Sequence, residues 1–476
     1  MSTDTQPGSP DAQPDDAALA ATRKNNTRGK VLTASMVGTT IEFFDFYAYA
    51  TASSLVFPAL FFPSQTSTTQ LLSSFAIFGV AFVARPLGSI IFGHFGDRIG
   101  RKKTLIASLL IMGIGTFLIG LLPTATTPGW IVLAPLLLVL LRFCQGVGLG
   151  GEWSGAALLA TENAPKGKRA IWGTFPQLGA PVGFIIANLL FVALNAWTSP
   201  EAFLAWGWRI PFLLSALLVA VGLYVRLSLM ETPAFQLVAQ KQQISKAPIG
   251  RVFKTSWKPL LLGTFIMLAT YVIFYFMTAF TLTYGTSPAT TGQAKMAAEA
   301  AGKTFDPVGF VAGLGYSKNE FLTYLIIGVV FFGIFTVVSG PLAEKLGRRK
   351  MLLGVTVLIA AYGLVVNALF NAGTPGVIIA LIVGFILMGL TFGPMAAYLP
   401  ELFPANVRYT GSAVSYNMSS VIGAGPAPFA MVALWQAEGG TIFWCGLYIV
   451  GAAILTLIAL FLAKDTSDLD MEAELN

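Results

Sequence analysis

The chain has 476 residues, of which 55% are hydrophobic and only 11% are charged, and its formal net charge is +7. Soluble globular domains carry about 25% charged residues, so this composition excludes a soluble protein. No basic patch interleaved with aromatic residues supports nucleic-acid binding, and we expect the excess positive charge to lie in loops that face an anionic lipid leaflet.

The chain begins with an acidic, polar stretch, residues 1–20, that lacks the apolar core of a signal peptide. We therefore expect residues 1–30, and also residues 464–476, to be disordered cytoplasmic tails. Between the tails, twelve stretches have the roughly 20 mostly apolar residues that a membrane helix needs. They are residues 32–58, 70–93, 104–122, 130–160, 170–195, 209–230, 259–284, 320–342, 351–370, 375–399, 409–434 and 441–463.

These spans predict an all-α, multi-pass membrane protein with two halves of six helices, residues 31–230 and 259–463, joined by a cytoplasmic linker, residues 231–258. Charge predicts the orientation. Of the 29 Lys and Arg residues, we place Arg85, Arg142 and Arg209 within spans or at their edges. Of the other 26, three lie on one side (Lys295, Lys303 and Lys318) and 23 on the other. Because positive loops stay inside, we expect both termini to be cytoplasmic.

Two short polar segments occur once in each half. Residues 93–103, GHFGDRIGRKK, return 247 positions later as residues 340–350, GPLAEKLGRRK. Residues 161–169, TENAPKGKR, share an acid, a proline and an arginine at equal spacing with residues 400–408, PELFPANVR. An internal duplication on this scale is common among secondary transporters.

The first repeated segment resembles the loop signature of the major facilitator superfamily. Further stretches resemble the metabolite:proton symporter family within it, which includes shikimate, proline/betaine, citrate and dicarboxylate carriers. They are residues 85–103, RPLGSIIFGHFGDRIGRKK, residues 145–165, QGVGLGGEWSGAALLATENAP, residues 205–212, AWGWRIPF, and residues 399–411, LPELFPANVRYTG. The resemblance covers residues 30 to 463. It implies twelve transmembrane helices in two pseudo-symmetric six-helix bundles that alternate access to a central site.

Five ionisable side chains lie away from the ends of the predicted spans of the first half: Glu42, Asp45, Arg85, Arg142 and Glu152. Taken at about 3 kcal/mol each, five unpaired charges would cost on the order of 15 kcal/mol of insertion energy. They must therefore pair or reach water. A structural ion network is one interpretation, and proton coupling is the other, since ionisable groups at this depth are usually functional. We predict that all five take part in proton coupling.

Asp45 is the predicted proton carrier, because desolvation and a neighbouring arginine act on a carboxylate in opposite directions. We expect it to alternate between an ionised state paired with Arg142 and a protonated, released state. An acid of the first helix and an arginine of the fourth resemble this pair in related sugar/proton carriers. The second half shows no comparable mid-helix charge, so we expect it to supply mostly neutral contacts.

The predicted substrate contacts are polar or aromatic side chains at a plausible depth: Gln177, Tyr271, Tyr275, Tyr416 and Asn417, with Arg142 or Arg85 as the anchor for a carboxylate. Helix packing is the alternative for each of the neutral ones.

The repeated loops predict a cytoplasmic gate. Asp97 with Arg101, and Glu344 with Arg348, are placed to form ion pairs, and the resemblance implies that Asp97 also faces a helix N-terminus of the opposite half. Charges that only set topology are the alternative. The full predicted set is Gly93, Asp97, Arg98, Gly100, Arg101, Glu162, Arg169, Glu344, Gly347, Arg348, Glu401 and Arg408.

The sequence lacks the motifs of metalloproteases, hydrolases and P-loop enzymes, so we expect neither an enzyme nor an ATP-driven pump. We expect Cys144 and Cys445 to be packing residues, and we expect neither a metal site nor a cofactor. The predicted function is proton-coupled uptake of a small organic acid or zwitterion by a monomer in the cell membrane. An antiporter of the same fold is the alternative. The substrate stays open among shikimate-like hydroxy acids, di- and tricarboxylates, aromatic acids, and proline or betaine.

Overall fold

The computed structural model describes residues 27–63, 66–99, 101–165, 167–227, 248–300, 307, 310–404 and 407–466. Within these residues the chain is helical and contains no strand. It crosses the molecule twelve times, six times on either side of the linker.

The first six passes are α2 (Arg28–Leu55), α4 (Ser67–Ile99), α5 (Arg101–Leu121), α6 with α7 (Leu133–Leu149 and Glu152–Glu162), α8 with α9 (Arg169–Gln177 and Gly179–Trp197), and α11 (Ile210–Leu227). Short helices connect some of them: α3 (Phe57–Phe61), α10 (Pro200–Ala205) and the 3₁₀ turn η1 (Gly207–Arg209).

The last six passes begin with α14 (Trp257–Ile266), α15 (Leu268–Tyr275), η2 (Phe276–Phe280) and α16 (Thr281–Thr286), which together make one pass. They continue with α18 (Lys318–Leu346), α19 (Arg348–Phe370), α20 (Gly373–Glu401), the pass made of α21 (Arg408–Ser419), η4 (Ser420–Ala424) and α22 (Pro426–Ala437), and finally α23 (Phe443–Leu462). Two further helices lie outside the passes, α13 (Pro248–Thr255) and α17 (Thr291–Ala300).

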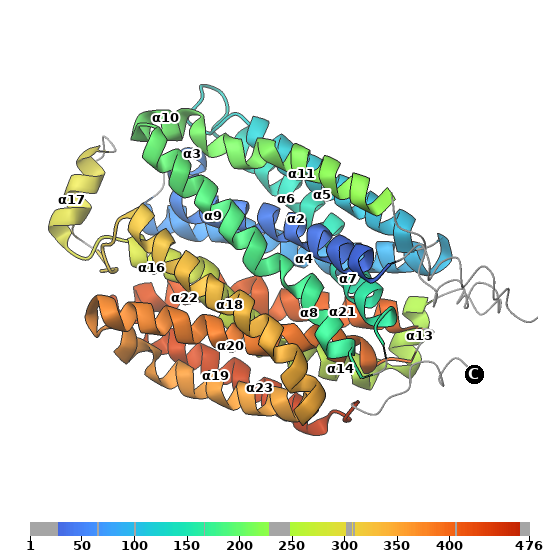
Figure 1. Ribbon diagram of the computed structural model, residues 1–476. Helices are drawn as coiled ribbons and strands as arrows, with labels where there is room; N and C mark the ends of the chain where they lie inside the picture. Colours follow the sequence, from blue (N-terminus) through green and yellow to red (C-terminus); the bar gives the residue numbers. More distant parts are fainter. Residues whose placement is uncertain are drawn as a thin grey trace, which may run out of the picture.

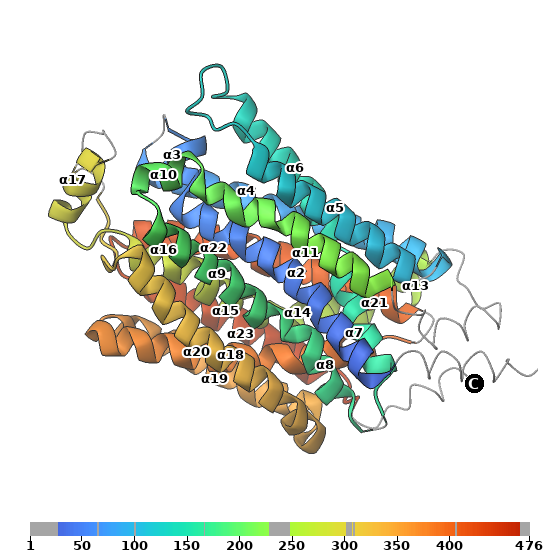
Figure 2. The ribbon, with the colours of Figure 1, turned by 45° about the horizontal axis from the view of Figure 1, so that its top comes forward.

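The two sets of six passes form two neighbouring bundles, one from α2 to α11 and the other from α14 to α23 (Figure 1). We call the end that carries Gly93 of α4 and Gly347, between α18 and α19, the motif end. At this end α2 begins and α23 finishes (Figure 1). We call the opposite end, beyond which α17 stands apart from the bundles in both views, the α17 end (Figures 1 and 2).

Eleven helical segments of the described chain are long and apolar enough to cross a membrane. Each corresponds to a predicted span, with boundaries that differ by a few residues. The predicted first span is α2, which has 28 residues but is not among the eleven. It is less apolar because Glu42, Asp45 and several Thr and Ser residues lie within it.

Large apolar side chains are exposed on the outer faces of the bundles, for example Leu136 on α6, Leu217 on α11, Leu364 on α19 and Phe461 on α23. Aromatic and aliphatic side chains also fill the interface between the halves, where Phe43 of α2 lies 6.0 Å, centroid to centroid, from Phe274 of α15. An apolar exterior around a packed interior is what a protein dissolved in lipid requires.

Several parts of the predictions lie outside the described residues. They include residues 1–26 and 467–476 of the predicted tails and residues 231–247 of the predicted linker. Among the predicted gate residues, Gly100 lies outside as well. The helix positions of Asp97, Arg98 and Arg101 are described, but their side chains are not.

Candidate functional site

A narrow cavity lies between the two bundles. Its lining comes from α2, α4, the α14–α15 region, α20 and α21, and consists of Phe43, Arg85, Met267, Thr270, Tyr271, Phe274, Tyr275, Phe392 and Tyr416. Arg85 is the charged member of this set. Three of the predicted substrate contacts, Tyr271, Tyr275 and Tyr416, are thus brought together around one space.

Arg85 is 3% exposed and lies over aromatic rings of its own half. Its guanidinium carbon is 4.9 Å from the centre of the Phe82 ring and 5.8 Å from that of Phe46. Its Nε has no hydrogen-bond partner among the described residues, and neither has the hydroxyl of Tyr271 across the cavity. A buried donor without an acceptor is costly, so this cavity has unmet capacity to hold an acceptor group.

Asp45, in the middle of α2, is 2% exposed and forms no ion pair within the described part of the chain. Its Oδ2 accepts a hydrogen bond of 2.9 Å from the hydroxyl of Thr116 on α5, whereas its Oδ1 has no partner there. The predicted direct pair with Arg142 is therefore not formed in this structure. The guanidinium of Arg142 is instead held by Gln145, through a bond of 3.1 Å from Nη1 to Oε1.

Arg142, on α6, is fully buried inside a cage of aromatic rings. Its guanidinium carbon lies 4.0 Å from the centre of the Tyr49 ring, 5.1 Å from that of Phe78 and 5.6 Å from that of Phe46. Cation–π contacts of this kind stabilise a desolvated guanidinium. Arg142 does not belong to the cavity lining, although Phe46 contacts both arginines.

Glu42 lies one turn before Asp45 on α2 and is also 2% exposed. Its Oε2 has no hydrogen-bond partner among the described residues. The two carboxylates are thus both buried within the first bundle, away from the outer apolar faces.

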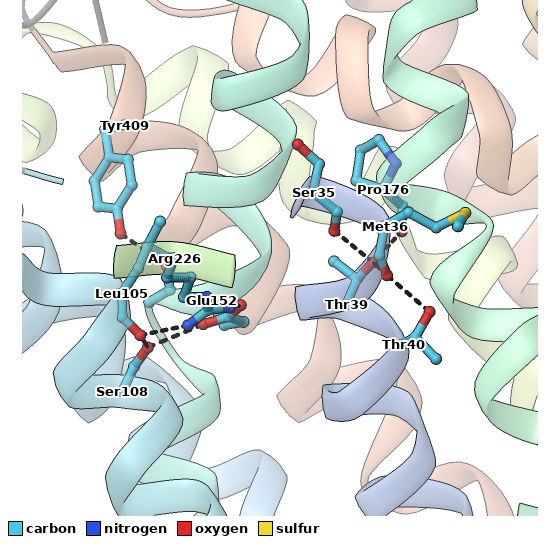
Figure 3. A network of polar contacts seen from close by, with 11 residues as sticks. Ser35, Met36, Thr39, Thr40, Leu105, Ser108, Glu152, Pro176, Arg226 and Tyr409 are labelled. Atoms are coloured by element: carbon cyan, nitrogen blue, oxygen red, sulfur yellow. Dashed lines mark hydrogen bonds and ion pairs between the residues drawn. The ribbon is translucent and has the colours of Figure 1, made fainter. Parts of the chain in front are cut away.

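Glu152 differs from the other predicted proton-coupling residues because it has a charged partner. It forms an ion pair with Arg226 of α11 (Figure 3), and its Oε2 accepts a hydrogen bond of 3.0 Å from Ser108. Arg226 also donates to the carbonyl of Leu105. Arg226 lies close to the end of its predicted span, yet it is only 6% exposed.

The predicted contacts Gln177 and Asn417 bridge the two bundles near the motif end. Gln177 accepts from the indole of Trp153 at 2.9 Å and donates to the carbonyl of Phe392 in the second half at 2.7 Å. Asn417 donates to the carbonyl of Gly150 at 2.8 Å. Trp153, which was not predicted, stacks on Tyr416 with centroids 3.9 Å apart and planes 3° apart.

The predicted gate residues of the second half form a connected cluster. Arg348 lies 3.3 Å from Glu344 and 3.2 Å from Glu401, as nitrogen–oxygen distances. Glu344 also accepts a hydrogen bond of 2.6 Å from the backbone N–H of Ala170, in the first turn of α8 in the other half. Glu401 further accepts from Thr466, beyond α23, at 2.7 Å.

Of the other predicted gate residues, Glu162 and Arg169 belong to the first half, whereas Gly347 and Arg408 belong to the second. Glu162 finishes α7, Arg169 begins α8, and Arg408 begins α21 and donates to the carbonyl of Phe403 at 3.3 Å. Gly347 has φ of +86°, a conformation that favours glycine, and it turns the chain from α18 into α19.

The repeated glycines Gly93 and Gly340 occupy matching places. A Cβ added at Gly93 would lie 3.6 Å from Oγ1 of Thr410 in the first turn of α21, and one added at Gly340 would lie 2.9 Å from Cα of Ile171 in the first turn of α8. In each half, the first glycine of the repeated motif therefore packs against the first turn of a helix in the other half.

The chain is similar to known transporters. A family model described as "Sugar (and other) transporter" matches residues 30–259 and 307–473. The inner membrane metabolite transport protein YhjE of Escherichia coli (strain K12) is 52% identical over 443 residues, which cover 93% of this chain and 95% of that protein. The shikimate transporter of the same organism is 32% identical over 465 residues, covering 95% of this chain and 98% of that protein.

A solved structure of the E. coli xylose transporter XylE, in a partially occluded inward-open conformation, matches with a TM-score of 0.69. The match covers 93% of this chain and 99% of that chain at 14% sequence identity. XylE is described as a proton:xylose symporter of the major facilitator superfamily. The predicted fold, that of the major facilitator superfamily, is therefore confirmed.

Proposed function

Because the chain belongs to the Sugar (and other) transporter family and is a multi-pass membrane transporter, we propose that it takes up a small organic acid or zwitterionic metabolite together with a proton. The two bundles alternate access to the cavity between them, and both termini lie on the cytoplasmic side. The observation that carries the proposal is the presence of two buried groups with unmet partners. Asp45 has no ion pair within the described residues, and Arg85 has an unpartnered Nε beside the cavity.

Asp45 is the proposed proton site. A carboxylate inside a lipid-embedded bundle is expensive to keep ionised without a cation in contact, whereas the protonated form carries no charge and tolerates the same place. A group with this property can take up a proton on one side and release it on the other when the bundles move. Glu42, one turn away, is the second proposed proton site, and Glu152 is neutralised by Arg226 and is proposed to be structural.

Arg85 is the proposed anchor for the substrate carboxylate, in preference to Arg142. Arg85 lines the cavity, whereas Arg142 is enclosed by Tyr49, Phe46 and Phe78 and is bonded to Gln145. Guanidinium groups bind carboxylates through paired hydrogen bonds. The other lining residues are mostly aromatic, so the body of the substrate would lie between rings and near the Tyr271 hydroxyl. This chemistry favours a compact carboxylate with an apolar or cyclic body.

Reconstituted vesicles test the proton coupling. With purified protein in liposomes, an imposed inward proton gradient is expected to drive accumulation of the substrate above its external concentration. Asp45→Asn is expected to abolish accumulation while leaving downhill exchange and the amount of protein in the membrane unchanged. Accumulation at the wild-type level by Asp45→Asn would reject the proton site. Accumulation driven only by an outward proton gradient from the lumen would indicate antiport.

A thermal-shift screen of the purified protein at two pH values tests the substrate class. The compounds are shikimate-like hydroxy acids, di- and tricarboxylates, aromatic acids, proline, betaine, and matched uncharged amides. We expect carboxylates to stabilise the protein and their amides not to, and we expect Arg85→Gln to lose the stabilisation while Arg209→Gln, outside the cavity, retains it. Equal stabilisation by an acid and its amide would reject Arg85 as the anchor.

A further inference from the structure

Four buried side chains join α2, α5 and α6 in a continuous chain of hydrogen bonds. Arg142 Nη1 donates to Gln145 Oε1 at 3.1 Å, Gln145 Nε2 donates to Thr116 Oγ1 at 2.6 Å, and Thr116 Oγ1 donates to Asp45 Oδ2 at 2.9 Å. None of the four is more than 2% exposed.

The direction of every bond in this chain follows from Arg142. A guanidinium only donates, so the oxygen of the Gln145 amide must face it and the NH₂ group must face Thr116. The oxygen of Thr116 then accepts from Gln145, which leaves the single hydroxyl hydrogen of Thr116 free for another acceptor. An ionised Asp45 only accepts, and it is the acceptor at the end of the chain.

Thr116 has two acceptors for that one hydrogen. Besides Asp45 Oδ2, the carbonyl of Met112 lies 3.1 Å from Thr116 Oγ1. When Asp45 is ionised, the charged oxygen is the stronger acceptor. When a proton is added to Oδ2, the carboxyl O–H donates to Thr116 instead, and the threonine hydrogen turns to Met112. One proton is gained by Asp45, and no covalent bond is made or broken elsewhere.

We propose that Thr116 and Gln145 are positioning residues that transmit the protonation state of Asp45 to Arg142, in place of a direct ion pair. With Asp45 ionised, the aligned bonds stabilise the guanidinium charge. With Asp45 protonated, Arg142 loses this stabilisation while its Nε and Nη2 have no partner among the described residues. The ring of Phe46, which contacts both Arg142 and Arg85, connects this change to the cavity.

The other charged groups around Asp45 do not take over this connection in the structure. Glu42 lies on the same helix one turn away, and Arg85 lies on α4 at the cavity. On α7 and α11, Glu152 and Arg226 neutralise each other. At the other end of α11, Arg209 donates to the carbonyls of Gly120 and Leu122. Thr116 donates a hydrogen bond of 2.9 Å to the Asp45 carboxylate, and the hydroxyl of Ser215 on α11 also lies near this carboxylate.

The proposal rests on the proposed proton coupling, and it is tested by the pH dependence of uptake. Thr116→Val removes a hydrogen bond that favours the ionised carboxylate, so Asp45 is expected to hold its proton to higher pH. The pH of half-maximal uptake should rise by about one unit. Thr116→Ser, which keeps the hydroxyl, should restore the wild-type profile. Gln145→Leu should shift the profile in the same direction by less, because Thr116 can still donate to Asp45.

Thr356→Val is the matched control, because Thr356 is a buried threonine of α19 whose hydroxyl donates to its own helix, at Leu352. It should leave the profile unchanged. Where wild-type uptake depends on pH, an unshifted profile in Thr116→Val, or the same shift in Thr116→Ser or Thr356→Val, would overturn the proposal.

Infrared difference spectroscopy separates a failure of this proposal from a failure of the proposed function. The carbonyl band of protonated Asp45, identified by its loss in Asp45→Asn, can be titrated in purified protein without transport. An upward shift of its midpoint in Thr116→Val, restored by Thr116→Ser, supports the connection even if wild-type uptake proves independent of pH. An unshifted midpoint rejects it even if uptake is proton-driven.

Discussion

At the scale of single residues, the buried ion pair between Glu152 and Arg226 shows how the first bundle holds charge in its interior (Figure 3). Each of these charged groups also forms a hydrogen bond with a neutral group. Glu152 accepts from Ser108, and Arg226 donates to the carbonyl of Leu105. A Cβ added at Gly38 of α2 would lie 2.6 Å from the Arg226 guanidinium, so α2 closes over the pair. Each charge is therefore shielded from water and depends on the other.

This dependence predicts that removing one partner is worse than removing both. Arg226→Met leaves the carboxylate of Glu152 buried and unpaired, which costs about 3–5 kcal/mol. The double change Glu152→Leu with Arg226→Met removes both charges and should recover most of that stability. Thermal unfolding of the purified protein in detergent measures both.

The exposed pair between Lys295 and Glu299 on α17 is the control for this comparison. Its atoms are 3.9 Å apart and its side chains are 66% and 63% exposed, so Lys295→Met should cost less than about 1 kcal/mol. If the double variant at positions 152 and 226 is no more stable than the single one, the pair has a role that is not electrostatic.

The sequence predicted which acids of the first bundle are buried but not their partners. Glu42, Asp45 and Glu152 stand out because acids are rare in apolar spans. Thr116 and Gln145 do not stand out, since a threonine or glutamine in a membrane helix is usually a packing residue. Arg226 lies near the end of its predicted span, where a positive charge is common, so nothing in the sequence marked it as the partner of Glu152.

At the scale of elements, the N-terminus of α8 is held by an acid from the other bundle. Glu344 of α18 accepts from the backbone N–H of Ala170, in the first turn of α8, and lies beside Arg348. A negative charge at this place satisfies an unpaired N–H and interacts favourably with the helix dipole. We therefore propose that this contact favours closure of the motif end.

Removing the charge should shift the protein toward opening at the motif end. Glu344→Gln is expected to reduce the stability of the closed state by about 0.3–1 kcal/mol. This changes the ratio of closed to open molecules by up to about fivefold. Distances between spin labels on α8 and α18 would report the change. Glu299→Gln, on the exposed face of α17, is the control and should leave the distances unchanged. A population shift toward the closed state would contradict the proposed contact.

The elements themselves were largely predictable. Long apolar spans and the repeated loops place every pass within a few residues of its observed bounds, because the requirement for about 20 apolar residues is strong. The interruptions were not predicted. Gly150 and Gly151 separate α6 from α7, and η4 lies between α21 and α22. Neither break changes the apolar character of its span, so the sequence pattern does not reveal it.

At the scale of the whole molecule, the two bundles touch at both ends of the cavity. At the motif end, Gly340 faces the backbone of Ile171 across the interface. On the side of the cavity toward the α17 end, a Cβ added at Gly79 of α4 would lie 3.3 Å from the carbonyl oxygen of Gly425, between η4 and α22. Both contacts bring the backbones of the two halves close together, one on each side of the cavity.

Alternating access requires that one of these two contacts opens while the other stays closed, so bulky side chains at the two glycines should have opposite effects. Gly340→Leu cannot fit against Ile171 and should hold the motif end open. Gly79→Leu crowds the carbonyl of Gly425 and should favour opening on the α17 side. Each should reduce uptake strongly while the protein stays folded, and label pairs across the two ends should lengthen at one end and not at the other.

Gly354 on α19 and Gly451 on α23 provide the matched controls. Both are exposed glycines of membrane-spanning helices with no atom within 4 Å of an added Cβ, so Gly354→Leu and Gly451→Leu place the same side chain on the outer face. They should retain uptake and the wild-type label distances. Lengthening at the same end in Gly79→Leu and Gly340→Leu would mean that the bundles do not rock about the cavity. The cavity around Arg85 would then have to be reached by a movement of single helices.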